Sequence, residues 1–454
     1  MGTVGLNFGS VTSGQGFDVA QTVTQIQASE QAIETPWQNQ LTTLKAQDTV
    51  FSSLGTDLSS LTTSLQALTS FDGVLSAKQG SSSDTSIISL TSAAATAQAG
   101  SHTITVSQLA QTSSDISTAI SNPNDTLSGA LTIQGHTFNV DSADSDTSIA
   151  SLSAAINSAG IGVSSSVITD SSGSRLSIVS GTSGAAGQLT ISSSLSGASS
   201  GAITFQTGQT GQDAKLTVDG VSITSSSNTV SGAISGVTFQ LLASSATPTP
   251  VQVQITNDTT AVGSALSSFV FAYNTVVKDV NTQEGNDSSG KPEPLYGSPT
   301  IATIQSDLTT ALFSGTASGS ISNITQLGLT VNNDGTLSLN SDTLNSVLNS
   351  NYSDVTGFLQ NAGSFGQTLS SALSNVGTQA PSGAIYLAQQ QNATEETSLN
   401  LDITNENATL ATQKTTLTTE LNTANQILQS IPSQLNEVNQ IYSAFTGYYT
   451  VPGG

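Results

Sequence analysis

The sequence predicts an α+β protein in which long helices at both ends of the chain flank a middle that is rich in β-strands. Near both termini, apolar residues recur at the three- and four-residue spacing of a coiled coil. Between these regions, short runs alternate apolar and polar residues and are separated by Gly, Ser and Asn, which is typical of strands and turns. A single helix cannot bury its own apolar stripe, so each end of the chain needs a partner.

Each terminal region contains one apolar stripe, which we call a seam. The N-terminal seam consists of Leu44, Phe51, Leu54, Leu58, Leu61, Leu65 and Leu68. The C-terminal seam consists of Leu410, Leu417, Leu421, Ala424, Leu428, Ile431, Leu435, Val438, Tyr442 and Phe445. The seams could pair with each other inside one chain, or they could bind a neighbouring subunit or a host assembly. We expect them to be assembly surfaces, and a purely intramolecular core role stays open.

The composition excludes several classes of function. Thirty acidic residues against seven basic ones give a formal net charge of −23, which repels nucleic acids and anionic lipid surfaces. Only 8% of the residues are charged, so the polar surface must consist largely of hydroxyl and amide side chains. We therefore expect no nucleic-acid partner.

The sequence also bears on membranes, secretion and redox chemistry. It has no run of about 18 consecutive apolar residues, so we expect no membrane insertion. The first residues lack the basic and apolar regions of a cleaved signal peptide. The absence of cysteine excludes disulfides and thiol chemistry, and it is compatible with a chain that passes unfolded through a narrow channel.

The first predicted helix begins near Val19, with Asp18 as its N-cap, and follows a flexible segment rich in Gly and Ser. Pro36 is expected to kink or divide this helix, which then continues to about Ser70. Strands such as the one containing Ile104 and Val106 follow.

The middle of the chain contains two predicted hairpins and a short helix. The first hairpin turns at Gln134-Gly135, and the second turns at Asp219-Gly220, a dipeptide that tolerates a type I′ turn. Between them, the spacing of Ile149, Leu152 and Ile156 predicts a helix that Gly160 stops. Further strands are expected around 163–178 and 237–241.

The helical period returns in the C-terminal half. Helices are predicted over about 262–280 and 301–312, followed by a hairpin that turns at Asp334-Gly335 and a short helix near Leu344 and Val347. The last long helix is expected from about Ala384 to Phe445, with a bend at Pro432.

These elements define five predicted segments. Residues 1–70 form the flexible start and an N-terminal coiled-coil leg, and residues 384–454 form a C-terminal coiled-coil leg. Residues 71–115 and 257–383 form the two parts of a stem domain, the second of which contains helices and a hairpin. Residues 116–256 form a β-rich head with two expected subdomains.

Two segments resemble enzyme motifs only superficially. Residues 285–292 have the glycine and lysine spacing of a phosphate-binding loop, but Pro292 replaces the hydroxyl that would hold Mg²⁺, and a helix precedes the segment. Gly197-Ala198-Ser199-Ser200-Gly201 fits the nucleophile pattern G-x-S-x-G, but both histidines precede Ser199, and hydrolases of that kind need one after it. We expect residues 285–292 to be a linker and Ser199 not to be a catalytic serine.

The candidate metal ligands are also weak. His102 and His136 have no third ligand nearby in the sequence, as zinc would require. The acidic cluster Asp141, Asp144 and Asp146 lacks the glycine and the final glutamate of a calcium loop. No pair of titratable groups is placed for acid–base work, so we expect no catalytic residue, no metal, no cofactor and no enzyme activity.

Several motifs resemble one family jointly. The start contains Gly14, Gly16, Phe17, Asp18 and Val19, followed by the leucine heptads. The segments 103–110, 148–167, 219–221, 228–241, 269–274, 295–305 and 327–339 follow in family order. The chain thus resembles the flagellar filament-capping family, also called flagellar hook-associated protein 2, over nearly its whole length.

The resemblance implies a homo-oligomeric cap outside the cell, at the distal tip of the bacterial flagellum, that serves motility. It implies export by flagellar type III secretion without a cleaved signal peptide. The implied partners are other copies of the chain, flagellin, hook-filament junction proteins and a flagellar export chaperone. The cap would promote insertion and folding of exported flagellin subunits.

Two other functions stay open. The chain could be flagellin itself or a structural subunit of the hook-filament junction, although the start at Gly16-Phe17-Asp18 argues against this. It could also serve cell adhesion, because a head rich in Ser and Thr would face the environment.

Overall fold

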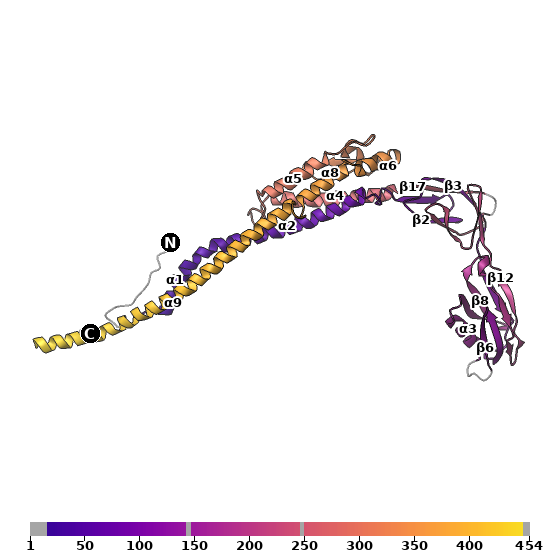
Figure 1. Ribbon diagram of the computed structural model, residues 1–454, viewed down its shortest axis with the longest axis horizontal. Helices are drawn as coiled ribbons and strands as arrows, with labels where there is room; N and C mark the ends of the chain where they lie inside the picture. Colours follow the sequence, from indigo (N-terminus) through magenta and orange to yellow (C-terminus); the bar gives the residue numbers. More distant parts are fainter. Residues whose placement is uncertain (1–15, 142–146, 246–248, 448–454) are drawn as a thin grey trace. The chain divides into compact units, whose positions relative to one another are not determined.

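The computed structural model describes residues 16–141, 147–245 and 249–447 and confirms the predicted α+β class (Figure 1). The chain forms two compact units: Met1–Gln66 with Leu266–Gly454, and Ala67–Ala265. We call them the helical unit and the β-rich unit. The predicted flexible start lies outside the described residues, apart from Gly16.

The helices of the first unit come from both ends of the chain. They are α1 (Val19–Glu30), α2 (Glu34–Thr69), α4 (Thr259–Gln283), α5 (Pro299–Leu312), α6 (Ser341–Ser350), α7 (Tyr352–Gln360), α8 (Phe365–Val376) and α9 (Ala384–Thr446). α2 and α4 extend across the boundary into the other unit. The strands β18 (Leu329–Val331) and β19 (Leu337–Leu339) form the predicted hairpin at Asp334-Gly335.

The start of the helical region follows the sequence closely. The carboxylate of Asp18 accepts a hydrogen bond from the N–H of Gln21, which makes Asp18 the predicted N-cap of α1. A 3₁₀ turn over Gln31–Ile33 separates α1 from α2. Pro36 therefore lies in the first turn of α2, where a missing N–H costs no helical hydrogen bond. The division predicted at Pro36 occurs just before it.

The sequence prediction missed α7 and α8. Both are short, and their apolar residues pack on each other: the rings of Phe358 and Phe365 stack with centroids 5.4 Å apart. Ser364 begins α8 by accepting a hydrogen bond from the N–H of Gln367.

The β-rich unit has two apolar cores. The first lies between a five-stranded sheet, ordered β1-β17-β3-β13-β14, and a three-stranded sheet, ordered β15-β16-β2. The strands are β1 (Lys78–Ser82), β2 (Ile88–Ala93), β3 (Gly100–Gln108), β13 (Ala214–Val218), β14 (Val221–Ser225), β15 (Thr229–Ile234), β16 (Val237–Leu241) and β17 (Val251–Asn257).

The second core involves a sheet ordered β12-β4-β8-β7, a smaller sheet ordered β11-β10-β5-β6 with β9 beside β5, and the helix α3. These elements are α3 (Ile149–Ser158), β4 (Thr112–Ser117), β5 (Leu127–Ile133), β6 (His136–Val140), β7 (Val163–Asp170), β8 (Gly173–Ser183), β9 (Ile191–Ser193), β10 (Ser196–Gly197), β11 (Gly201–Ala202) and β12 (Phe205–Gln209). Every strand pair is antiparallel.

Both predicted hairpins are present, and the turn at Asp219-Gly220 has the type I′ geometry that its sequence tolerates. Asp219 and Gly220 have φ angles of 48° and 83°, and Gln134 and Gly135 have φ angles of 52° and 81°. Positive φ at both central residues is the signature of a type I′ turn, whose twist suits the flanking antiparallel strands.

α4 is the one described helix that is long and apolar enough to cross a membrane. Core helices of soluble proteins meet the same criteria. One face of α4, which includes Phe269, Val276 and Val280, is buried against the rest of the protein, whereas Phe271 on another face is 75% exposed. α4 therefore contributes one face to the core of this fold.

Candidate assembly site

The N-terminal seam is buried inside the protein. Each of its seven residues on α2 is at most 8% exposed, and Leu61 is fully buried. Burial of leucine side chains contributes about 1.5–3 kcal/mol each, so the seam is a major source of stability. These seven residues are therefore not free surface in the isolated chain.

One partner of α2 is α9, which runs antiparallel to it in the helical unit (Figure 1). The amide nitrogen of Asn392 donates to the carboxylate of Asp48 at 2.8 Å, and that of Gln389 donates to the hydroxyl of Ser52 at 3.3 Å. Closer to the start of α2, Gln40 donates to Glu395. Along these three pairs, the residue numbers increase on α2 and decrease on α9. The two helices are therefore antiparallel, and the pairs define their register.

α2 also packs against α4, and two carboxyl groups meet there. Burial, a hydrogen bond with Asp279 and the charge of Asp279 raise the pKa of Asp57 from 3.8 to about 6. Oδ2 of Asp57 is enclosed and accepts no hydrogen bond from a donor in the described part of the chain. The interface thus holds one proton more readily than an exposed pair of aspartates would.

The motif at the start of the chain docks on α9. The N–H of Phe17 donates to Oδ1 of Asn425 at 3.0 Å, and the ring of Phe17 is buried. A Cβ atom at Gly16 would overlap the amide of Asn425, so glycine allows this close approach. Val19 is half-buried and Asp18 caps α1. Gly14 lies outside the described residues.

α1 continues this docking further along α9. The side-chain amide of Gln27 donates to the backbone carbonyl of Leu410 at 2.9 Å. Neither Gln27 nor Asn425 belongs to a predicted seam. Both are polar, and apolar spacing therefore gave no signal for them.

The C-terminal seam changes character along α9. Leu410 is buried, and Leu417, Leu421, Leu428 and Ile431 are half-buried. The members beyond them are exposed: Leu435 by 47%, Val438 by 60%, Tyr442 by 58% and Phe445 by 93%. Ala424 is exposed as well. The end of α9 therefore carries an apolar face that no described part of the chain covers.

Two exposed apolar residues of α9 were not identified by the sequence analysis. Ile427 and Ile441 are 58% and 67% exposed and lie on the same helix. The predicted seam contains only residues at successive three- and four-residue steps, and these two residues do not fall on those steps. Ile441 directly precedes Tyr442, which belongs to the seam. We call Leu435, Val438, Ile441, Tyr442 and Phe445 the α9 terminal face.

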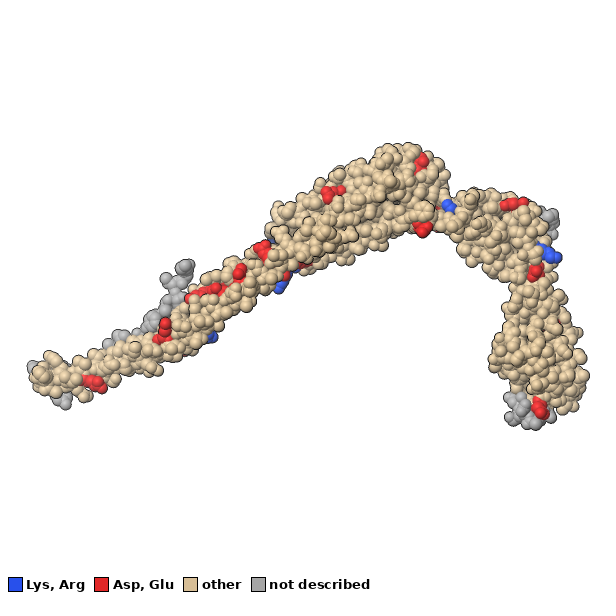
Figure 2. Space-filling view, viewed as in Figure 1, with Lys and Arg blue, Asp and Glu red and all other residues tan. Residues whose placement is uncertain are grey.

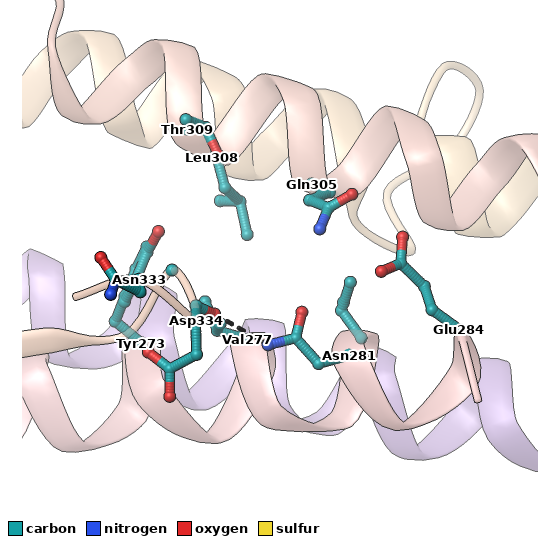
Figure 3. A pocket seen from close by; sticks show the side chains of 11 residues that line it. Tyr273, Val277, Asn281, Glu284, Gln305, Leu308, Thr309, Asn333 and Asp334 are labelled. Carbon is teal, nitrogen blue, oxygen red and sulfur yellow. Dashed lines mark hydrogen bonds between the residues drawn. The ribbon is translucent and has the colours of Figure 1, made fainter. Parts of the chain in front are cut away.

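A cavity of about 370 Å³ lies between α4, α5 and the β18–β19 turn (Figure 3). Tyr273, Val277 and Leu308 provide apolar walls, and the side chains of Asn281 and Gln305 lie at its edge. Asn281 donates to the backbone carbonyl of Asp334 at 2.8 Å and so ties the turn to α4.

Two titratable groups that line this cavity have shifted pKa values. Burial raises the pKa of Tyr273 to about 12, so its hydroxyl stays protonated at neutral pH. The hydroxyl and N–H of Thr336 donate to Asp334 and lower the pKa of its carboxyl. The described residues contain no cluster of three or more His, Cys, Asp or Glu that could hold a metal.

In each of the two enzyme-like segments, N–H and hydroxyl groups donate hydrogen bonds to a carboxylate of the chain itself. In the phosphate-loop resemblance, the hydroxyl and N–H of Ser289 and the N–H of Lys291 donate to Asp287, which lowers its pKa. A carboxylate therefore occupies the position in which the loop would hold an anion.

In the G-x-S-x-G segment, the N–H groups of Ser199 and Ser200 and the hydroxyl of Ser200 donate to Asp125. Burial by itself would raise the pKa of Asp125, but these donors outweigh it and lower the pKa. Both serines therefore help to hold a structural carboxylate.

The histidines lie in separate sheets. Nδ1 of His102 on β3 is 2.7 Å from the carboxylate of Asp219, which also accepts a hydrogen bond from the N–H of Thr103. His136 on β6 packs edge-on against Phe138, with ring centroids 4.9 Å apart. Of the acidic cluster, Asp144 and Asp146 lie outside the described residues.

The acidic charge is dispersed over the surface. Figure 2 shows isolated acidic side chains between large uncharged areas, with few basic side chains. The chain contains a single arginine, Arg175. Contacts between such surfaces depend on apolar packing and hydrogen bonds more than on ion pairs.

Two protein-family models match this chain, one in its N-terminal part and one in its C-terminal part. The family model described as Flagellar hook-associated protein 2 C-terminus matches residues 211–435, and that described as Flagellar hook-associated protein 2 N-terminus matches residues 15–113. These ranges include Gly16, α2, the five-stranded sheet and α9 as far as Leu435.

Individual relatives agree with the family models. The chain is 30% identical over 406 residues to flagellar hook-associated protein 2 of Escherichia coli, covering 81% of this chain and 85% of the relative. It is 28% identical over 355 residues to the B-type flagellar hook-associated protein 2 of Pseudomonas aeruginosa, covering 70% and 74%.

The fold also matches a solved structure. The crystal structure of the flagellar cap protein FliD D1-D2-D3 domains from Escherichia coli superposes with a TM-score of 0.58 at 28% identity, covering 76% of this chain and 99% of that one. The predicted resemblance is thereby confirmed in sequence and in fold, and the chain belongs to the flagellar hook-associated protein 2 family.

Proposed function

We propose that this protein is the cap at the distal tip of the flagellar filament, where it promotes insertion and folding of exported flagellin subunits. The mechanism requires no catalysis. It rests on reversible packing of apolar helix surfaces, which bind a subunit and release it as the filament grows. The family assignment and the geometry of α9 support this proposal.

One observation carries it. The first seam is buried by the chain's own helices, whereas the α9 terminal face remains exposed on a helix of 63 residues. An amphipathic helix with an open apolar face is stabilised when a partner covers that face. A long helix with such an end is suited to reach into a larger polymer.

The proposed partners follow from the same role. They are further copies of this chain, flagellin, the hook-filament junction proteins and an export chaperone that covers apolar surface before assembly. The proposed location is outside the cell at the flagellar tip, reached by type III export without a cleaved signal peptide.

The experiment replaces the α9 terminal face and leaves the buried seam intact. A chain with Val438→Ser, Tyr442→Ser and Phe445→Ser is expressed in cells from which its gene has been deleted. We expect normal export, short or absent filaments and flagellin lost to the medium, as seen by electron microscopy and immunoblotting.

A matched control changes exposed polar residues of the same helix. Asn436→Ser with Gln440→Ser is expected to leave filament length unchanged, because both side chains are exposed and uncharged. Normal filaments and full motility in the triple variant would refute the proposed role of the face. Adhesion to host glycans by a variant without filaments would instead support the adhesin alternative.

A further inference from the structure

The second sheet of the β-rich unit ends in an edge strand. β7 is the last strand in the order β12-β4-β8-β7 and pairs with β8 on one side. In the ladder, Ser165 lies opposite Ile178 and Ile168 lies opposite Arg175. The other side of β7 has no strand beside it in the described part of the chain.

One residue already occupies part of that free side. The side-chain amide of Asn157 on α3 donates to the carbonyl of Ser165 at 2.8 Å, and its oxygen accepts from the N–H of Ser165 at 2.7 Å. Both backbone groups of Ser165 therefore point away from β8, and Asn157 satisfies them as a neighbouring strand would.

The period of two along a strand extends this geometry to Val167 and Thr169. Their backbone N–H and C=O groups also point away from β8. In the described part of the chain, the N–H groups of Val167 and Thr169 have no hydrogen-bond partner. β7 thus leaves two residues open for strand pairing, bounded by Asn157 on one side and by the turn after Asp170 on the other.

The side chains here do not oppose pairing. Edge strands are commonly protected by Lys, Pro or a bulge. Residues 163–169 contain only Val, Ser, Ile and Thr, and Val167 and Ile168 are 36% and 51% exposed. The one charged residue of the strand, Asp170, lies 3.5 Å from the guanidinium of Arg175.

We propose that β7 pairs antiparallel with β7 of a second copy of this chain, about a two-fold axis at Ile168. In this register Val167 lies opposite Thr169 of the other copy, and Ile168 lies opposite its own counterpart. Each open N–H and C=O of the two residues then gains a partner, giving four hydrogen bonds across the axis.

Asn157 selects this register over its neighbour. If Val167 lay opposite its own counterpart, Thr169 would lie opposite Ser165, whose backbone groups are already bonded to Asn157. In the proposed register Asp170 faces Ser166, so no like charges are opposed. The segment is therefore complementary to itself, and this favours a second copy as the occupant over an unrelated strand.

The proposed contact is separate from the role at the filament tip. A two-fold contact uses the same patch on both copies and closes after two, so it cannot by itself build a ring. It would join two free chains, or two assemblies, through their β-rich units. Either proposal can therefore fail while the other holds.

The test uses the full chain, whose lack of cysteine makes any introduced thiol unique. Ile168→Cys places two thiols opposite each other in a non-hydrogen-bonded pair, where Cα atoms are about 4.5 Å apart and a disulfide can form. We expect mild oxidation to yield a disulfide-linked dimer at least about tenfold faster than for Val221→Cys. Val221 lies on β14, the edge strand of another sheet, and is 64% exposed.

A second substitution tests the hydrogen bonds. Adding Thr169→Pro to Ile168→Cys removes one of the open N–H donors and is expected to slow the cross-linking to the rate of Val221→Cys. Equal rates for Ile168→Cys and Val221→Cys, or no effect of the proline, would overturn the proposal.

A measurement on the unaltered chain removes any dependence on the variants. We expect residue-resolved hydrogen exchange of the Val167 and Thr169 amides to slow as the protein concentration rises. The Ser165 amide, already bonded to Asn157, should not change. Fast exchange at Val167 and Thr169 that is independent of concentration would also overturn the proposal.

Discussion

Asn425 shows how a single polar side chain can join the two ends of the chain. Its Oδ1 accepts the N–H of Phe17, across a separation of 408 residues. A net protein hydrogen bond contributes about 1 kcal/mol, so we expect Asn425→Ala to weaken the docking of the start of α1 by about that amount.

The measurement is hydrogen exchange over residues 16–30. Exchange of the Phe17 amide should accelerate roughly fivefold in Asn425→Ala, which corresponds to about 1 kcal/mol. Asn422→Ala is the control, because Asn422 is exposed on the same helix. Equal protection in both variants would show that the buried ring of Phe17 holds α1 without this bond.

Asp57 gives the helical unit a specific response to pH. Its pKa in the fold is about 6, above the 3.8 of a free aspartate, so the folded state keeps a proton that the unfolded chain loses. Stability should therefore fall as the pH rises from about 4 to about 6 and change little above that through this group.

Asp57→Asn removes this response. We expect the variant to be more stable than the parent at pH 7, with a flatter dependence of the melting temperature between pH 4 and pH 6. Asp402→Asn, at an exposed position on α9, is the control and should leave the pH dependence as it was. A parent protein whose stability rises over this range would contradict the role given to Asp57.

At the scale of elements, the two seams should respond in opposite ways to truncation. Leu61 is fully buried on α2, so Leu61→Ala should cost about 2–5 kcal/mol of unfolding free energy. Phe445 is 93% exposed, so Phe445→Ala should change stability by less than about 0.5 kcal/mol. Thermal and urea unfolding of the purified chain measure both. A large loss of stability in Phe445→Ala would mean that the end of α9 is covered within its own chain.

The sequence predicted the elements whose conformation depends on residues within the element itself. The turns at Gln134-Gly135 and Asp219-Gly220 require positive φ angles, which glycine at the second turn position adopts freely, and both hairpins were predicted correctly. α7 and α8 were missed, and their stability depends on packing between the two helices, as between Phe358 and Phe365. Helices this short gain little from their own hydrogen bonds.

The candidate site was predictable only in part, for a related reason. Heptad spacing identifies an apolar stripe, but it is the same for Leu61, which is buried, and Val438, which is exposed. Which part of a stripe is covered depends on where the partner helices end. The role of Asn157 at the edge of β7 likewise exists only once α3 and the sheet are in place.

At the scale of the whole molecule, the two units should separate experimentally. The β-rich unit is continuous in sequence and contains two apolar cores of its own. We expect a fragment of residues 67–265 to fold alone, with a cooperative thermal transition and a circular-dichroism spectrum dominated by β-structure. A fragment that lacks a cooperative transition would show that its cores need the terminal helices.

The pairing of α1 with α9 has a consequence for the newly made chain. Residues 17 and 27 have their partners at residues 425 and 410, which are synthesised 408 and 383 residues later. The β-rich unit can fold during translation, because its segment is complete much earlier. Residues 17 and 27 therefore lack these partners while several hundred further residues are made, and during that time they are accessible to factors that bind nascent chains.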